Sequence, residues 1–392
     1  MRDSVQTYPL EVLSHVEALS LFAQHALGKQ NFDSHPTLKL YGEGIVKKCG
    51  GLTLALVTLG RALRTKSIHE EWVELLNNEI WNLSNDGSNI LPALRLSYYD
   101  FPPHLKQMFA YSPRITCLAR TNSSCFGWQK AFCTSQMSNT MESLGSKYFE
   151  ELVSRSFFQH STTNKSHYRM HDLINDLATS VAGEYFFMLG EKIDVSCRYN
   201  TLEKLCHFSY IFQQYGVYSK FKALHLARRL RTFLPMSLRI DRWQSFYLSS
   251  KVLTELFPQL QFLRVLSLAN YGIRVVPHSI GSLKHLRYLN FSNTDITFLL
   301  EQVSNLYNLQ SLMLSGCQRL SSLPDSLVNM KELPRGIAGL TGLQTLSKVI
   351  VRDANGFKIS HLKDLHHLQG RLTIEGLHKV TNSIDAKEAK LD

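Results

Sequence analysis

The sequence predicts a multidomain α+β protein in which helical domains are followed by a repeat solenoid. One leucine pattern occurs three times, at Leu263–Leu268, Leu286–Phe291 and Leu309–Leu314, with starting positions 23 residues apart. That period is typical of leucine-rich repeats, each of which adds one short strand to a parallel ladder. Upstream of residue 190, apolar residues follow the spacing of amphipathic helices instead. The two periods therefore place helices first and the solenoid second.

Composition and charge limit the classes of protein to which this chain can belong. The 392 residues are 44% hydrophobic with a formal net charge of +11, which fits two or three globular domains. No arginine-rich block or zinc-finger spacing accompanies the basic charge, so we expect no specific nucleic-acid partner. The seven cysteines show no paired spacing, which favours a reduced chain in the cytoplasm. No apolar run is long enough for a membrane span, and the N-terminus is not a signal peptide.

The first 85 residues predict a small helical bundle. Ser14–Glu17 has the pattern of a capping box ahead of an apolar stripe, so a helix is expected over about 14–27. Two more helices are expected over about 36–49 and 52–64, and a fourth follows them. Gly50–Gly51 separates the second helix from the third, because glycine is the residue that most often ends a helix.

A further amphipathic helix is predicted after residue 171. Asp172 stands at its start, where an acidic side chain can cap free N–H groups and meet the positive end of the helix dipole. His171 is then held at a helix N-terminus, which is a natural position for contact with an anion. The same residues also fit an ordinary capped core helix with a histidine on its surface. The apolar stripe of this helix consists of Leu173, Ile174, Leu177, Ala178, Val181 and Ala182.

Met170–Asp172 and the helix behind it resemble the Met-His-Asp motif of plant nucleotide-binding leucine-rich-repeat disease-resistance proteins of the coiled-coil class. Gly51–Leu54 is similar to the Gly-Leu-Pro-Leu motif of that family, and residues 90–98 and 144–158 resemble its connecting segments. The resemblance implies four domains: an NB-ARC helical subdomain (1–85), a winged-helix-like NB-ARC subdomain (86–190), an irregular linker with the first repeats (191–260), and leucine-rich repeats (261–392). The first repeat strands are expected at 206–210 and 230–234.

The resemblance also implies a nucleotide site. In the family, ADP is held in the closed state and ATP in the open state, the histidine approaches the β-phosphate of ADP, and the proline of Gly-Leu-Pro-Leu packs on adenine. Thr53 replaces that proline here. The implied cofactor-binding residues are Gly51, Leu52, Thr53, Leu54, Met170, His171 and Asp172.

A phosphate-binding loop of the form G-x-x-x-x-G-K-[ST] occurs nowhere in the sequence. We therefore interpret the chain as partial, without the phosphate-loop domain and the N-terminal coiled coil of the family. On this interpretation the chain alone is expected not to bind ADP or ATP.

Residues 112–141 depart from the family pattern. Gly127–Phe132 reads Gly-Trp-Gln-Lys-Ala-Phe, and one coding sequence for it encodes the family's Met-Ala-Glu-Gly-Phe in a shifted frame. Ser112–Thr116 has a similar relation to the family's Phe-Pro-Lys-Asp-Tyr. We interpret 112–141 as translated out of frame and expect it to be disordered, with the resemblance resuming at about Glu142.

The repeats predict a partner surface and a local defect. Leu333-Pro334 follows Leu323-Pro324 after only 10 residues, so the strand of one repeat is missing. We expect residues 343–346 to supply the next strand beside 312–314, while 324–340 bridge on the outer side with Leu333 and Ile337 packed there. Side chains that alternate outward from the strands form the expected partner-binding face: Arg264, Ser267, Arg287, Asn290, Gln310 and Met313.

Two functions remain open. The first is a plant innate immune receptor in which an ADP/ATP switch signals and the repeats provide recognition and autoinhibition. Its partners would be a pathogen effector or a guarded host protein, together with the chain's own NB-ARC region. The second is a degenerate fragment that acts only as a protein-interaction module without nucleotide control. No nucleophile, base or metal constellation stands out, so we do not expect an enzyme.

Overall fold

A computed structural model describes most of the chain, which divides into two units. The first unit comprises residues 1–117 and 147–181, and the second comprises 118–146 and 182–392. The described residues are 11–82 without 65 and 67, 91–110, 118–119, 141–160, 167–189, 202–211, 215–236, 246–321 without 300, 340–351 without 341, 358–380 and 382–389.

Helices α1 to α4 form the start of the first unit. They are α1 (His15–Leu27), α2 (Pro36–Cys49), α3 (Thr53–Leu63) and α4 (His69–Asn77), followed by a 3-10 turn at Glu79–Asn82. The predicted helices over 14–27, 36–49 and 52–64 are confirmed. The capping box is also confirmed, because the Ser14 hydroxyl accepts from the Glu17 N–H and Glu17 accepts from the Ser14 N–H.

Aromatic side chains fill the core of this bundle. Trp72 on α4 is fully buried, and the rings of Phe22 and Phe32 meet it edge-on at centroid distances of 5.9 and 6.2 Å. Edge-to-face pairs of this kind add about 0.5–1.5 kcal/mol to the free energy of apolar burial. The bundle thus has a specific aromatic centre that fixes α1 against α4.

The rest of the first unit joins helices to a short hairpin. It contains α5 (Pro92–Tyr99), α6 (Pro103–Ala110), most of α8 (Met141–Ser154), β2 (Gln159–His160), β3 (His167–Arg169) and α9 (Asp172–Ala182). Strands β2 and β3 pair antiparallel. A two-residue strand β1 (Leu118–Ala119) precedes α8 in the sequence.

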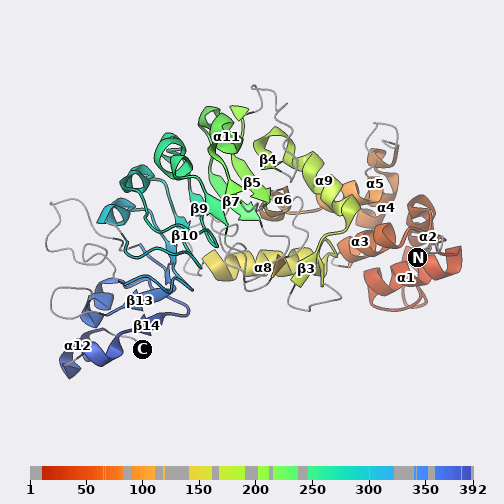
Figure 1. Ribbon diagram of the computed structural model, residues 1–392. Coiled ribbons are helices and arrows are strands. Elements are labelled where there is room, and N and C mark those ends of the chain that lie inside the picture. Colours follow the sequence, from red (N-terminus) through yellow and green to blue (C-terminus); the bar gives the residue numbers. More distant parts are fainter. Residues whose placement is uncertain are drawn as a thin grey trace, which may run out of the picture. The chain divides into compact units, whose positions relative to one another are not determined.

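A seven-stranded parallel sheet is the spine of the second unit, with strand order β12-β11-β10-β9-β7-β5-β4. Its strands appear in succession in Figure 1 as the green-to-blue ribbon. Their bounds are β4 (Phe186–Leu189), β5 (His207–Ile211), β7 (Thr232–Met236), β9 (Val265–Ser267), β10 (Tyr288–Asn290), β11 (Ser311–Met313) and β12 (Thr345–Leu346). The first repeat strands expected at 206–210 and 230–234 are therefore confirmed as β5 and β7. Strand β4 lies at the edge of the sheet, in a segment that the sequence had assigned to the winged-helix-like domain.

Short turns and helices complete each repeat. They are a 3-10 turn at Gly183–Tyr185, α11 (Tyr218–Phe221), a π-turn at Val252–Leu256, 3-10 turns at Lys222–Leu226, Phe257–Gln259, His278–Ser282, Glu301–Asn305, Ile359–Asp364 and Leu377–Lys379, and α12 (Ser383–Glu388). Strands β6 (Tyr215–Gly216) and β8 (Tyr247–Leu248) form a second small parallel pair, as do β13 (Lys348–Ile350) and β14 (Thr373–Glu375).

The register of the ladder confirms the predicted skip of one strand. Leu266 lies opposite Leu289, Leu289 opposite Leu312, and Leu312 opposite Leu346. All four leucines are at most 1% exposed. The expected strand beside 312–314 therefore comes from 345–346. The expected packing of Leu333 and Ile337 on the outer side lies outside the described residues.

Candidate functional site

The first predicted site segment is the glycine turn that opens α3. Gly51 has a φ of +71°, and its carbonyl accepts a hydrogen bond from the Leu13 N–H at 3.1 Å. A Cβ added at Gly51 would lie 2.6 Å from the Leu13 carbonyl oxygen. Both the backbone angle and the close approach therefore require glycine at this position.

Leu52 and Thr53 are exposed at the start of α3. Leu52 is the N-cap residue and is 41% exposed, and no side chain caps the helix. Leu54 is half-buried, and the stretch then enters the core at Ala55. The segment thus presents an apolar side chain and a hydroxyl to solvent beside free N–H groups of the first helical turn.

The second predicted site segment begins α9. His171 is the residue before the helix, and its Nδ1 accepts a hydrogen bond from the Leu173 N–H at 3.2 Å. Its carbonyl accepts the first helical bond, from the Asn175 N–H. The expectation that Asp172 caps the helix is wrong, because Asp172 lies inside the first turn and the imidazole of His171 takes the capping role. In the neutral ring the proton then resides on Nε2, which can donate to an acceptor.

Packing of the hairpin fixes where His171 lies. Tyr168 on β3 is 2% exposed and meets the ring of Phe149 on α8 edge-on at 4.9 Å. Met170 is 9% exposed, whereas His171 and Asp172 are exposed. Two buried side chains therefore hold the backbone immediately before an exposed histidine.

These residues fit part of a nucleotide site. His171 can donate to an anion, and Leu52 offers an apolar contact, but no described residue of the two segments supplies a cradle of N–H groups and a lysine for phosphates. Both segments belong to the first unit. Among the described residues, no hydrogen bond or ion pair joins Gly51–Leu54 to Met170–Asp172, and we derive no position for a bound nucleotide.

The predicted partner face is only partly accessible. Arg264, Arg287, Gln310 and Met313 are partly exposed, but Ser267 is 3% exposed and Asn290 is fully buried. The expectation that these two side chains are free is therefore wrong. Asn290 accepts from the Ser292 N–H and donates to the Tyr288 hydroxyl, so its amide is used within its own repeat. Parallel strands are commonly buried on both faces, which the alternation rule ignores.

Three arginines stand one above the other just before successive strands. The Arg264 N–H donates to the Arg231 carbonyl and the Arg287 N–H donates to the Arg264 carbonyl, each at 2.8 Å. Burial, and then the positive charges of Arg231 and Arg287, lower the pKa of Arg264. None of the three forms an ion pair with an acidic side chain of the described ranges. The column is thus a concentrated positive charge on the ladder, and it includes two of the predicted partner residues.

A buried histidine lies beside this column. His207 is 3% exposed, and its Nδ1 lies 3.1 Å from the Thr232 hydroxyl on the next strand. Burial, and then the charges of Arg231 and Arg264, lower the pKa of His207 to about 3. The side chain is therefore neutral at physiological pH. Nothing in its local sequence distinguishes His207 from a surface histidine, so the sequence does not predict its burial.

Known proteins are similar to this chain over nearly its whole length. A family model described as the winged helix domain of disease resistance proteins matches residues 128–178, and one described as a leucine-rich repeat region matches 243–386. The RPP13-like protein 1 of Arabidopsis thaliana, named as a disease resistance protein, is 36% identical over 99% of this chain. The disease resistance proteins RGA1 and RGA2 of Solanum bulbocastanum are 35% and 32% identical over the same share. The chain belongs to the plant disease-resistance family.

The chain matches only part of the length of its relatives, and its resemblance to the family begins earlier than we expected. The chain spans 38% of the length of each of these three relatives. The winged-helix match starts at residue 128, so the family resemblance reaches into the segment 112–141, where we had expected it to resume only at about Glu142. Apart from β1 and the start of α8, that segment lies outside the described residues, so its expected disorder stays a prediction.

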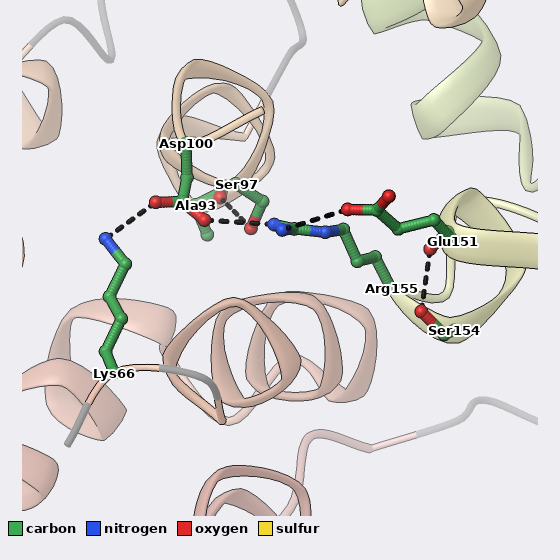
Figure 2. Close-up of polar contacts among 7 residues, drawn as sticks. All are labelled: Lys66, Ala93, Ser97, Asp100, Glu151, Ser154 and Arg155. Carbon is green, nitrogen blue, oxygen red and sulfur yellow. Dashed lines mark hydrogen bonds and ion pairs between the residues drawn. The ribbon is translucent and has the colours of Figure 1, made fainter. Parts of the chain in front are cut away.

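Sequence reasoning missed one polar cluster of this disease-resistance chain. Figure 2 shows Asp100 between the amino group of Lys66 and the guanidinium of Arg155, which also points toward Glu151. These residues come from separate parts of the first unit and share no local motif. Within the described ranges, the chain has no group of three or more metal-binding side chains and no helix that is long and apolar enough to cross a membrane.

Proposed function

We propose that this chain is part of a plant innate immune receptor in which a nucleotide switch controls signalling and the leucine-rich repeats provide recognition and autoinhibition. The observation that carries the proposal is the 36% identity to a disease resistance protein over 99% of the chain. The two family models add support at separate places, one on the winged-helix part and one on the repeats.

In this proposal the switch uses the two segments at Gly51–Leu54 and Met170–Asp172. His171 contacts the phosphate end of ADP through Nε2, because Nδ1 is engaged by the Leu173 N–H. Leu52 and Thr53 contact the base end. The phosphate anchor comes from a region that this sequence does not contain, so the chain alone does not hold ADP or ATP.

The repeats bind protein in the same proposal. The partner is a pathogen effector or a guarded host protein, and an intramolecular contact with the NB-ARC region keeps the receptor inactive. Of the residues assigned to this role, Arg264, Arg287, Gln310 and Met313 have exposed surface to offer. We place the protein in the cytoplasm, where its thiols stay reduced; Cys49, Cys206 and Cys317 are free. Its role is binding and signalling rather than catalysis.

A second candidate is an interaction module without nucleotide control. The continuous ladder through β11 and β12 favours it, since the repeats stay paired where one strand has been lost. Partner binding by such a module would not respond to nucleotide.

A chimera tests the proposal. The aligned 38% of RGA2 is replaced by this chain, and ADP binding is measured with and without His171→Ala. The switch proposal predicts that the chimera binds ADP and that the substitution weakens binding by about fivefold, the worth of one charge-assisted contact of about 1 kcal/mol. Equal ADP affinity of the two forms contradicts it, and failure of the chimera to bind ADP favours the interaction module. His160→Ala, at a histidine of the hairpin that precedes His171, is the matched control.

A further inference from the structure

A polar joint in the first unit connects α3, which carries one site segment, through the end of α5 to the end of α8. Asp100, which ends α5, uses both carboxylate oxygens: Oδ1 lies 2.6 Å from Lys66 Nζ, and Oδ2 accepts from Arg155 at 3.0 Å. The three side chains are 16–23% exposed. A shared carboxylate that is largely withdrawn from water holds its two cations more firmly than a surface pair does.

Arg61 adds a second connection on the same side. Its guanidinium donates to the carbonyl of Ser154 at 2.7 Å and to that of Val153 at 3.3 Å, and both carbonyls belong to the last turn of α8. Helix C-terminal carbonyls lack helical partners and carry the negative end of the dipole, so a cation is well placed there. Arg61 belongs to α3, and Lys66 follows α3 in the sequence. Both connections therefore run from the α3 side to the end of α8.

The backbone after α8 is strained at the same point. Ser156 has a φ of +66° in a Schellman turn: its N–H donates to the Val153 carbonyl and the Phe157 N–H donates to that of Leu152. A residue other than glycine in this conformation costs of order 1 kcal/mol and persists where its surroundings hold it. Here the anchors on either side are Arg155, bound to Asp100, and Phe157, whose ring lies 4.6 Å from Phe101.

Beyond this turn the chain leads directly to His171. Phe149 on α8 packs on Phe158 and on Tyr168 of β3, with ring centroids 5.1 and 4.9 Å apart. Helix α8 and strand β3 are thus connected by ring packing, and β3 leads into His171 and α9. On the other side, α3 begins at the Gly51 turn. The contacts that hold the end of α8 against α3 therefore also hold the strand that precedes His171.

We propose that Asp100 is a positioning residue: together with Lys66, Arg155 and the Arg61 contact, it holds the body made of α8 and the β2–β3 hairpin, which leads into α9, against helices α1–α3. Removing the Lys66–Asp100 connection frees that body to move while each part stays folded. The joint exists without nucleotide, and only its relevance to a switch rests on the proposed function.

Hydrogen exchange on the full chain without nucleotide tests the joint. Lys66→Met removes the connection from the α3 side and leaves Arg155 paired with Asp100, whereas Asp100→Asn weakens both pairs. We expect exchange in residues 147–182 to rise about tenfold or more in Asp100→Asn, and less in Lys66→Met, with exchange in 15–63 unchanged. Lys66→Arg retains the charge and restores protection.

Two results would overturn the proposal. Equal increases in 15–63 and 147–182 mean that Asp100 only stabilises the fold, and unchanged exchange in Lys66→Met means that there is no releasable connection; either overturns it. If Asp100→Asn does not fold, the contrast between Lys66→Met and Lys66→Arg decides alone. Lys363→Met is the matched control, because Lys363 pairs with Glu388 at 2.9 Å on the surface of the second unit and should not alter exchange in the first.

Discussion

Leu312 on β11 lies directly opposite Leu346 on β12, although the two residues are 34 positions apart in the sequence instead of the 23 that separate Leu289 from Leu312. The backbone ladder therefore continues from β11 directly to β12, as the shortened interval between the two Leu-Pro pairs predicts. Leaving β11 without a neighbour would expose a row of unpaired N–H and C=O groups, which is a costly edge for a solenoid.

The pairing makes Leu346 a core residue of the ladder. Leu346→Ala is expected to lower the free energy of unfolding by about 2–5 kcal/mol, because it removes a side chain that is 1% exposed and leaves a cavity. Chemical denaturation monitors the change. Leu377→Ala is the control, since Leu377 is 52% exposed and its truncation should cost little. Equal costs for the two variants would show that β12 does not pack on β11.

Acid should weaken the repeats through His207. Burial lowers the pKa of His207 to about 3 from its ordinary 6.5, so between these values the unfolded chain binds a proton that the folded chain does not. The free energy of unfolding therefore falls as pH decreases from 6.5 toward 3, by about 1.4 kcal/mol per pH unit from this residue. His207→Asn should flatten that slope in denaturation curves recorded from pH 7 to 4, whereas His285→Asn, at an exposed histidine, should not. A slope that is the same in His207→Asn and the parent chain would contradict this assignment.

A buried lysine begins β13, two residues after the end of β12. Lys348 is 5% exposed; its Nζ donates to the Cys317 carbonyl and pairs with Glu375, both at 2.9 Å. Removing one partner of a buried charge costs more than removing the charge itself. We expect Glu375→Ala to lower the free energy of unfolding by about 1–3 kcal/mol and Lys348→Met to lower it less. A double-mutant cycle, which includes both single variants, measures the two losses of stability. A larger loss in Lys348→Met than in Glu375→Ala would contradict the prediction.

Local periodicity explains which parts were predictable. The helices α1, α2 and α3 and the strands β5, β7 and β9 to β12 follow from apolar spacing and glycine stops, and the Leu312–Leu346 pairing follows from the shortened interval between two Leu-Pro pairs. The contact of Asp100 with Arg155 spans 55 residues and leaves no local pattern. Ser267 and Asn290 were misjudged because alternation predicts exposure only where one face of a sheet meets water. Asp172 was expected to cap α9, but Nδ1 of His171 accepts the hydrogen bond from the Leu173 N–H. The expected contact of His171 with an anion stays a prediction.

We propose that this chain carries contacts for a nucleotide but not its phosphate anchor. One histidine at a helix start supplies about 0.3–1 kcal/mol of attraction for an anion, whereas a micromolar Kd requires about 8 kcal/mol. Calorimetric titration of ADP into the full chain at matched concentrations, with His171→Ala in parallel, tests this proposal. We expect no measurable heat of binding for either form. Low-micromolar affinity for ADP that disappears in His171→Ala would contradict it.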